Sequence, residues 1–402
     1  MTETWTLATL WLGLALLATL LSIWLRVATA LSEIVVGTVA QLAIGAAMGG
    51  VLLGADDSWV KFLSGTGAIL LTFLAGAELD PAVFRVRWKE ATGIGLAGFI
   101  APFLGCTAVA FYMLHWEPRA SWLAGVALST TSVAVVYAVM LEFGLNRTDF
   151  GKVVLAACFI NDLGTVLALG LIFAPFTTRT LVFGMVSVAA FAVLPWLTPR
   201  FFRRYGGRPS ELEAKFLLLC LFGLGALATW AESEAVLPAY IVGMVLAGTV
   251  GKDHQLIRRL RTLTFGLLTP FYFIRAGSFV SVPALASAPL VFLVLLAAKM
   301  VSKSIAVFPV TRAFGSDHRE GIYTTLLMST GLTFGSISAL FGLTHGIITR
   351  EQYSYLVAAV IASAVVPTLI ANAVYLPRHL LQAPQETASI EPQQRETAEV
   401  RK

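Results

Sequence analysis

The segment VVLAACFINDLGTVLALGLIFAP, residues 153–175, decides how the chain is interpreted. It is apolar or weakly polar apart from one acid, and about 20 apolar residues are enough to cross a bilayer as a helix. Asn161 and Asp162 stand near its middle. A charge at mid-membrane costs about 2.5–3.5 kcal/mol on insertion scales, so such a residue marks an ion pathway, a proton relay or a counter-ion. The segment therefore predicts that Asp162 binds an ion, a proton or a basic side chain.

The composition is that of a polytopic membrane protein. Of the 402 residues, 57% are hydrophobic and 13% are charged, against roughly 25% charged residues in soluble domains. The net charge of +5 comes from basic residues between apolar segments, where it reports topology rather than binding to nucleic acid. The sequence has no glycine-rich nucleotide-binding motif, so we expect neither a nucleotide-binding domain nor a cofactor. The three cysteines form no CxxC pair, which argues against a disulfide framework or a zinc site.

Apolar segments of spanning length recur thirteen times. We predict transmembrane helices at residues 5–25, 32–53, 60–79, 88–113, 120–142, 150–174, 180–199, 211–231, 235–251, 262–281, 287–311, 320–343 and 353–376. Lys and Arg residues in or beside the odd-numbered connections number 17, against 4 for the even-numbered ones. Because basic loops stay in the cytoplasm, this pattern predicts a multi-pass protein of the cell's inner (plasma) membrane, with the N-terminus outside and the C-terminus cytoplasmic.

One basic connection, residues 200–215, divides the chain into two halves. Within it, Ser210 and Glu213 predict a capping box that starts the next helix. The tail, residues 383–402, is polar and contains several Gln, Glu and Pro residues, so we expect it to be disordered.

Short motifs of the first half recur in the second at an offset of 198 to 202 residues. The cluster Ser129–Ser132, with Phe143-Gly144-Leu145 after it, matches Ser329–Gly331 with Phe341-Gly342-Leu343 after it. An offset of seven helices places the second copy upside down in the membrane, as in many secondary transporters. We therefore predict an inverted repeat in which spans five and twelve are interrupted helices that cross.

The polar residues of these two spans are the candidate cation ligands. They are Thr130, Thr131 and Ser132 in the first copy, and Ser329, Thr330 and Gly331 in the second. Interrupted helices offer hydroxyls and unwound backbone carbonyls to a cation. Alternatively, the hydroxyls bond back to their own helices. The recurrence in both halves favours the first interpretation. Asn161 can supply a neutral oxygen ligand or bond an interrupted helix.

The acid itself is not repeated, because the offset leads from Asp162 to Ala364. Lys299 and Lys303 lie one turn apart near the middle of span eleven, and a buried Lys is costly unless it is neutral or paired. Two interpretations stay open. A lysine neutralises Asp162 and holds the helices together, or the carboxylate exchanges its partners, proton and metal cation, as the site faces each side. Arg275, near the external end of span ten, is expected to snorkel outward.

At these residues the chain resembles the monovalent cation:proton antiporter superfamily, in the branch that holds Kef-type and NapA-type exchangers. The resemblance covers roughly residues 30–380. It is carried by Leu71–Asp80 (LTFLAGAELD), by the Ser129–Ser132 cluster, by Asn161-Asp162, and by Lys303 with Arg312 and Gly315 after it. It implies an all-α membrane protein with an NhaA/NapA-like fold.

The resemblance also implies a division into domains. A dimerisation domain comprises residues 1–79 and 211–281, and a core ion-transport domain comprises residues 88–174 and 287–380. A linker helix and hinge loop, residues 180–210, joins them. The resemblance further implies a homodimer in which an aspartate, here Asp162, binds H+ and Na+, Li+ or K+ alternately, with a lysine, here Lys303 or Lys299, as its charge partner.

Three departures from the family pattern leave the cation and the stoichiometry open. Many electrogenic relatives have two acids where this chain has Asn161-Asp162. Electroneutral relatives often have an acid and a hydroxyl where this chain has Ala157 and Cys158. The Arg-Gly-Glu often found in span twelve is here Thr330-Gly331-Leu332.

The sequence thus predicts a transporter rather than an enzyme: a homodimeric antiporter in membrane lipid that exchanges a monovalent cation for a proton by alternating access and serves pH homeostasis. If Lys303 stays charged, exchange is electroneutral; if it also releases a proton, exchange is electrogenic. The lack of a second acid beside Asp162 favours the former. The alternatives are a Na+-coupled symporter of a small organic solute on a related fold, and a channel or scaffold in which Asp162 is purely structural.

Overall fold

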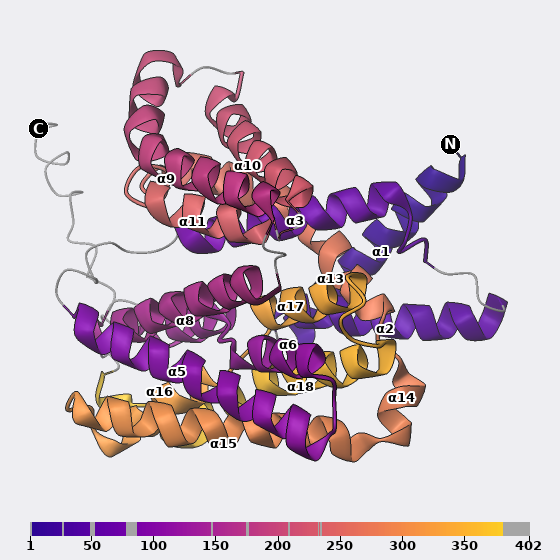
Figure 1. The fold of residues 1–402 in the computed structure, drawn as a ribbon, viewed down its shortest axis with the longest axis vertical. Coiled ribbons are helices and arrows are strands. Elements are labelled where there is room, and N and C mark those ends of the chain that lie inside the picture. Colours follow the sequence, from indigo (N-terminus) through magenta and orange to yellow (C-terminus); the bar gives the residue numbers. More distant parts are fainter. Residues whose placement is uncertain are drawn as a thin grey trace, which may run out of the picture.

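The computed structural model describes residues 2–25, 28–48, 53–77, 87–145, 148–173, 177–207, 210–231, 233 and 235–380. Over these residues the secondary structure is helical, with no strand (Figure 1). Helix is found in each of the thirteen ranges predicted from the sequence. Nine of the described helical segments are long and apolar enough to cross a membrane. The count of thirteen crossings therefore stays a prediction, and residues 383–402 and 78–80 lie outside the described part of the chain.

The first group of helices occupies the upper and right-hand parts of Figure 1. It consists of α1 (Thr2–Leu25), α2 (Thr29–Met48), α3 (Ser58–Ala77), α9 (Thr178–Tyr205), α10 (Leu212–Trp230), α11 (Val236–Leu246), α12 (His254–Leu263), the π-helical turn η3 (Thr264–Leu268) and α13 (Thr269–Ser278). Helices α3 and α11 cross where Gly76 faces Gly243. A Cβ atom at either glycine would collide with the backbone of the other helix. Small residues at such a crossing let membrane helices approach closely.

The second group forms the lower part of Figure 1. It consists of α5 (Trp88–Ala108), η1 (Val109–Met113), α6 (Pro118–Ser129), α7 (Val133–Glu142), α8 (Asp149–Phe173), α15 (Pro289–Ala313), α16 (His318–Met328), α17 (Thr333–Thr344), α18 (Arg350–Ile370), η4 (Ala371–Tyr375) and η5 (Arg378–Leu380). Helix α5 packs against α6, α8 and α15, and α17 packs against α6 and α18. This group surrounds the two helix interruptions.

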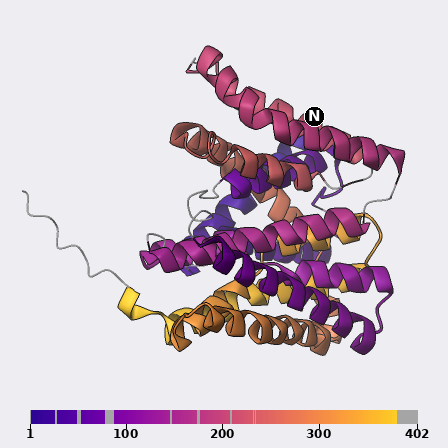
Figure 2. The same cartoon turned by 60° about the vertical axis from the view of Figure 1, so that its left-hand side comes forward.

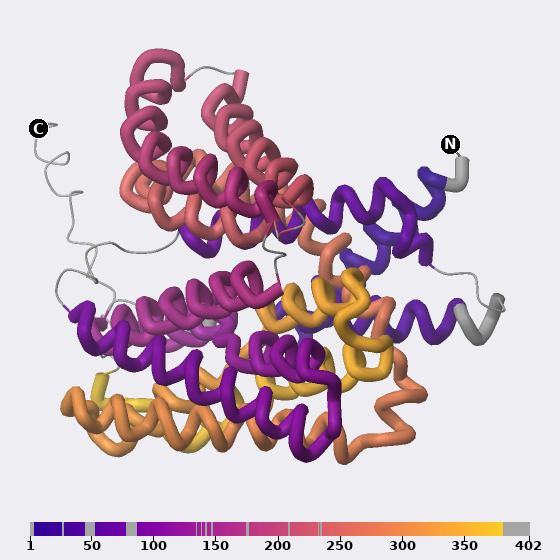
Figure 3. Tube along the Cα trace, viewed as in Figure 1, coloured from indigo at the N-terminus to yellow at the C-terminus, as the bar shows by residue number. Residues whose placement is uncertain are grey.

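The two groups are distinct layers in the turned view, with α9 at the top and α15 at the bottom (Figure 2). The trace in Figure 3 follows the chain from α13 through the short helix α14 (Val282–Ser287) into α15, which connects one group to the other. The division into a dimerisation domain, a core domain and a linker stays a prediction; α9, the predicted linker helix, packs against α10 and α11 of the first group.

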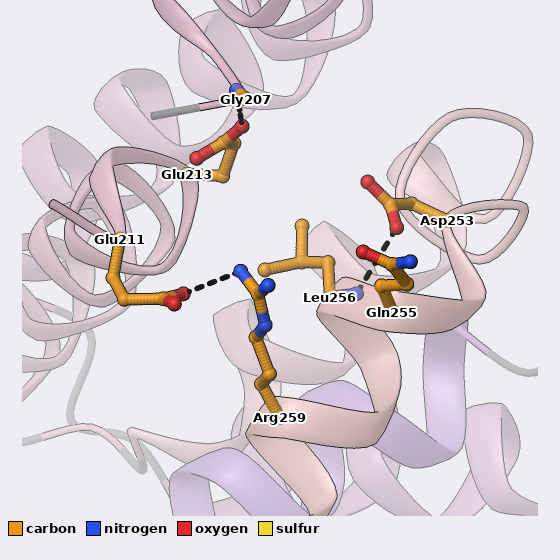
Figure 4. Close-up of a pocket in the computed structure, with 7 residues that line it drawn as sticks. All are labelled: Gly207, Glu211, Glu213, Asp253, Gln255, Leu256 and Arg259. Carbon is orange, nitrogen blue, oxygen red and sulfur yellow. Dashed lines mark hydrogen bonds and ion pairs between the residues drawn. The ribbon is translucent and has the colours of Figure 1, made fainter. Parts of the chain in front are cut away.

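The connection between the halves differs from its prediction. The capping box of Ser210 and Glu213 is wrong: α10 begins at Leu212 after Glu211, and the Glu213 carboxylate accepts a hydrogen bond from the Gly207 backbone N–H at 2.6 Å (Figure 4). Glu211 instead forms an ion pair of 2.9 Å with Arg259 of α12 across a cavity of about 400 Å³. Because its carboxylate reaches back to the loop, Glu213 closes the turn rather than starting the helix.

The predicted connection between spans nine and ten, residues 252–261, consists mostly of the helix α12. Asp253 caps this helix by accepting a hydrogen bond from Leu256 N–H at 3.0 Å. Leu256, Ile257 and Leu260 are buried, at the spacing of one helix face.

Arg275 does not snorkel outward as predicted. Its side chain is buried, and its Nε donates a hydrogen bond of 2.7 Å to the carbonyl oxygen of Ala55. Asp56 lies 3.8 Å from its guanidinium. The connection between α2 and α3 therefore folds over this arginine.

Candidate ion-binding site

The two interrupted helices meet at their breaks. Residues between α6 and α7 and those between α16 and α17 are not helical. The Ser132 backbone N–H donates to the Thr330 carbonyl oxygen at 2.9 Å, and the Thr131 hydroxyl donates to the Met328 carbonyl oxygen at 2.7 Å. The structure therefore brings together the two polar clusters that the sequence places about 200 residues apart.

Several of the predicted ligands instead bond to their own helices. Thr130 donates to the Ala127 carbonyl at 3.0 Å, Thr330 to that of Leu327 at 2.7 Å, and Ser329 to that of Thr325 at 2.7 Å. Such bonds satisfy the last carbonyls of a helix and compete with its continuation. These three hydroxyls donate as the alternative interpretation expects, and their oxygen lone pairs stay available to a cation, so their role as ligands stays a prediction. Among them and Thr131 only the Thr131 hydroxyl bonds across the break.

Asp162 and Asn161 lie on α8 beside the first break. Asp162 is 1% exposed and Asn161 is fully buried. The Asn161 side-chain amide donates to the Ser129 carbonyl oxygen at 3.2 Å. Asp162 Oδ1 and Asn161 Oδ1 have no hydrogen-bond partner among the described groups. Buried polar atoms are nearly always paired, so unpaired oxygens on two consecutive residues of α8 indicate that something binds here, and oxygen atoms are the ligands of hard cations.

The two lysines of α15 contact the breaks. Lys303 Nζ donates to the Thr131 hydroxyl at 2.7 Å. Lys299 Nζ has no hydrogen-bond acceptor among the described residues, and it lies against Gly331, where any Cβ atom would collide with it. Both lysines are fully buried. None of the ion pairs between described residues joins Asp162 to either lysine. In this conformation Lys303 holds the crossing through Thr131, and its role as the charge partner of Asp162 stays a prediction.

Other residues contribute to the site without having been predicted. Ser363 donates a hydrogen bond of 3.3 Å to the Gly331 carbonyl, one residue before Ala364. The Tyr240 hydroxyl of α11 donates to the Phe159 carbonyl of α8 at 2.9 Å and so joins the two helix groups. A tyrosine or serine in an apolar segment has the same pattern as a packed core residue, so the sequence held no signal for them.

Two further buried acids were not predicted. Glu33, near the start of α2, is 3% exposed, and Glu90, in the first turn of α5, is 8% exposed. Both stand near the ends of predicted spans, where charged residues are common. Asp162 is therefore not alone among the acids that the described structure buries.

Comparison with known proteins identifies the family. A family model described as sodium/hydrogen exchanger, transmembrane, matches residues 12–374. The chain is 25% identical over 331 residues to the probable Na+/H+ antiporter 3 of Methanocaldococcus jannaschii, covering 80% of this chain and 85% of that protein. It is 26% identical over 354 residues to a Na+/H+ antiporter of Enterococcus hirae, covering 81% and 90%.

Longer relatives and solved structures agree. The chain is 25% identical to cation/H+ antiporter 18 of Arabidopsis thaliana, with 79% of this chain aligned to 42% of that protein, so it spans less than half of the plant relative. The solved structure of the sodium proton antiporter MjNhaP1 from Methanocaldococcus jannaschii superposes with a TM-score of 0.69 at 14% identity, covering 94% of this chain and 98% of that one. At this identity the likeness shows the fold alone. The resemblance seen in the sequence is confirmed by the family match: this chain belongs to the sodium/hydrogen exchanger family of transmembrane proteins.

Proposed function

We propose that this protein is a secondary antiporter that exchanges a monovalent cation for a proton, and that both compete for Asp162. The observation that carries the proposal is the pair of unpaired oxygens, Asp162 Oδ1 and Asn161 Oδ1, buried beside the crossing of the interrupted helices. Membership of the sodium/hydrogen exchanger family supports it. The relatives compared above are named as antiporters, which favours exchange over symport or a channel.

Burial explains why the two ions compete. A bare carboxylate in a site closed to water is costly, whereas a protonated carboxyl group and a carboxylate–cation pair are both neutral overall. Asp162 can therefore cross from one open state to the other with either partner, and not with both or with neither. Asn161 holds the first break through Ser129 and turns its unpaired oxygen to the bound cation. Lys303 keeps the first break in place through Thr131.

The finer architecture is part of the same proposal. We propose thirteen spans in an inverted repeat, with the second helix group moving against the first in a homodimer. Helix in every expected range and the meeting of the two breaks support this proposal. An external N-terminus follows from the distribution of basic residues.

Na+ and K+ are both candidate cations. Relatives named Na+/H+ antiporters favour Na+. A glutathione-regulated potassium-efflux system protein of Haemophilus influenzae is 24% identical over 344 residues, with 54% of its length aligned, and favours K+.

The proposal is tested in everted membrane vesicles. After a pH gradient has formed, addition of Li+, Na+ or K+ should collapse it in wild-type vesicles. Asp162→Asn should abolish the response, because the amide binds neither a proton nor a cation as a counter-charge. Asp149→Asn is the matched control, since Asp149 is an exposed acid in the first turn of the same helix. Wild-type exchange by Asp162→Asn would refute the site.

A further inference from the structure

Two sulfur atoms stand beside the acid of α8. The Cys158 Sγ lies 3.7 Å from the Met328 Sδ, and both residues are fully buried. Cys158 precedes Asp162 by four residues on α8, so the two side chains share one face of the helix. Met328 is the last residue of α16, at the second break. A thiol and a thioether are thus placed one helical turn from the candidate ion ligand.

Buried polar side chains of α8 lie near this pair of sulfur atoms. The Met328 and Asn161 side chains converge on Gly98 of α5, where a Cβ atom would lie 3.1 Å from Met328 Cε and 3.5 Å from Asn161 Nδ2. Asp162 Oδ1 and Asn161 Oδ1 have no hydrogen-bond partner among the described groups. Two soft ligands therefore lie one helical turn from Asp162, whose Oδ1 is unpaired.

We propose that Cys158 and Met328, with Asp162 beside them, bind a soft monovalent cation of the Cu+ or Ag+ class. Thiolate and thioether ligands prefer such ions to Na+ or K+. The zinc–thiolate bond of about 2.3 Å serves as a guide, and the separation of 3.7 Å between the sulfur atoms is shorter than two such bonds. One ion can therefore lie between both sulfur atoms in a bent arrangement that leaves a third position open to the carboxylate.

Charge balance favours binding of a singly charged ion. The cation takes the place of the thiol proton, so that Cys–SH and Ag+ give Cys–S–Ag and a released H+. The net charge of the buried site does not change, which avoids the cost of an added charge in this setting. A bound soft ion next to Asp162 also blocks the binding site of the transported cation. This consequence for transport rests on the proposed function, whereas binding of the soft ion does not.

Binding is measured on the purified protein in detergent and chloride-free buffer, with Ag+ as the probe. The double variant Cys106→Ser/Cys220→Ser leaves Cys158 as the one thiol of the chain. After dialysis against Ag+ and free methionine, this protein should retain one Ag+ per chain by elemental analysis. Adding Cys158→Ser or Cys158→Ala should remove it. Adding Met328→Leu should weaken binding by about tenfold or more, whereas Met244→Leu on α11 is the matched control and should change nothing.

Two results would overturn the site. In the first, the protein that keeps Cys158 as its one thiol retains no Ag+. In the second, adding Met328→Leu leaves the affinity for Ag+ unchanged, which would mean that the thiol binds Ag+ without the thioether. Thermal unfolding of each variant without Ag+ establishes that it is folded. In vesicles, Ag+ should inhibit wild-type exchange and lose that effect in Cys158→Ala. Because binding is measured without transport, Ag+ binding together with exchange that survives Asp162→Asn would refute the proposed function and leave this site standing.

Discussion

The two helix interruptions look alike in sequence and differ in what they present. The first carries a hydroxyl that bonds to other helices: Thr131 donates to the Met328 carbonyl and accepts from Lys303. The second mainly offers backbone carbonyls, those of Met328 and Thr330 to the first break and that of Gly331 to Ser363. The acid stands only beside the first. In the proposed inverted repeat the two breaks are thus similar frames, of which the first lies beside the proposed ion ligand and the second supports it.

The largest effect is expected when the acid is moved from one frame to the other. The double variant Asp162→Asn/Ala364→Asp should show no exchange above background in vesicles. Ala364 is buried at the equivalent place on α18, but Ser363, its neighbour, already bonds Gly331, and the second half lacks a counterpart of Asn161. Recovery of exchange would contradict the asymmetry, and Ala364→Asp alone shows whether the new acid is tolerated.

Removing one hydroxyl from each break gives a matched pair of variants, Thr131→Val and Thr330→Val. Thr131→Val removes a bond that joins Lys303 to the crossing, and a hydrogen bond to a charged group contributes about 1.5–3 kcal/mol. Exchange should fall by about tenfold or more. Thr330→Val removes only a bond within its own helix, so its exchange rate should stay within about twofold of wild type. Equal losses in the two variants would mean that the breaks act alike.

Replacing either lysine should slow exchange less than replacing Asp162, and the two lysine variants should differ in rate. Lys303→Gln should slow exchange more than Lys299→Gln, because Lys303 Nζ bonds Thr131 while Lys299 Nζ has no described acceptor. Proteoliposomes with and without a clamped voltage measure both the rate and its dependence on potential. The reverse order would show that Lys299 is the charge partner of Asp162.

The smallest effect concerns the contact between helix groups. Tyr240→Phe removes the hydrogen bond to the Phe159 carbonyl while keeping the ring against Phe334. Loss of this bond should destabilise the protein by about 1 kcal/mol and leave exchange measurable. Thermal unfolding in detergent tests it against Tyr112→Phe, where the tyrosine is 73% exposed and no change is expected. An equal shift of the unfolding temperature in both variants would show that the Tyr240 hydrogen bond does not stabilise the protein.

The sequence predicted the residues whose burial in a membrane is costly. Asp162, Lys299 and Lys303 stand out because charge is costly within a span, and the repeated hydroxyl clusters located both breaks. It could not supply the pairings, which join distant segments: Arg275 with the Ala55 carbonyl, and Lys303 with the Thr131 hydroxyl.

Two further features were not predicted from the sequence, for different reasons. Met328 looks like an apolar filler, and only the meeting of α16 with α8 reveals that its sulfur faces Cys158. The helix α12 lies within a connection that the sequence marks by its basic residues, whereas Leu256, Ile257 and Leu260 have the spacing of one buried helix face.

The central claim is that one carboxylate serves both ions, and the most direct test is the dependence of the cation's KM on pH. Exchange by the wild-type protein is measured in proteoliposomes over a series of Na+ and K+ concentrations at several pH values on the cation-binding side. Competition for Asp162 predicts that the apparent KM rises in proportion to the proton concentration while the maximal rate stays constant. A maximal rate that falls with acidification at an unchanged KM would contradict the shared site.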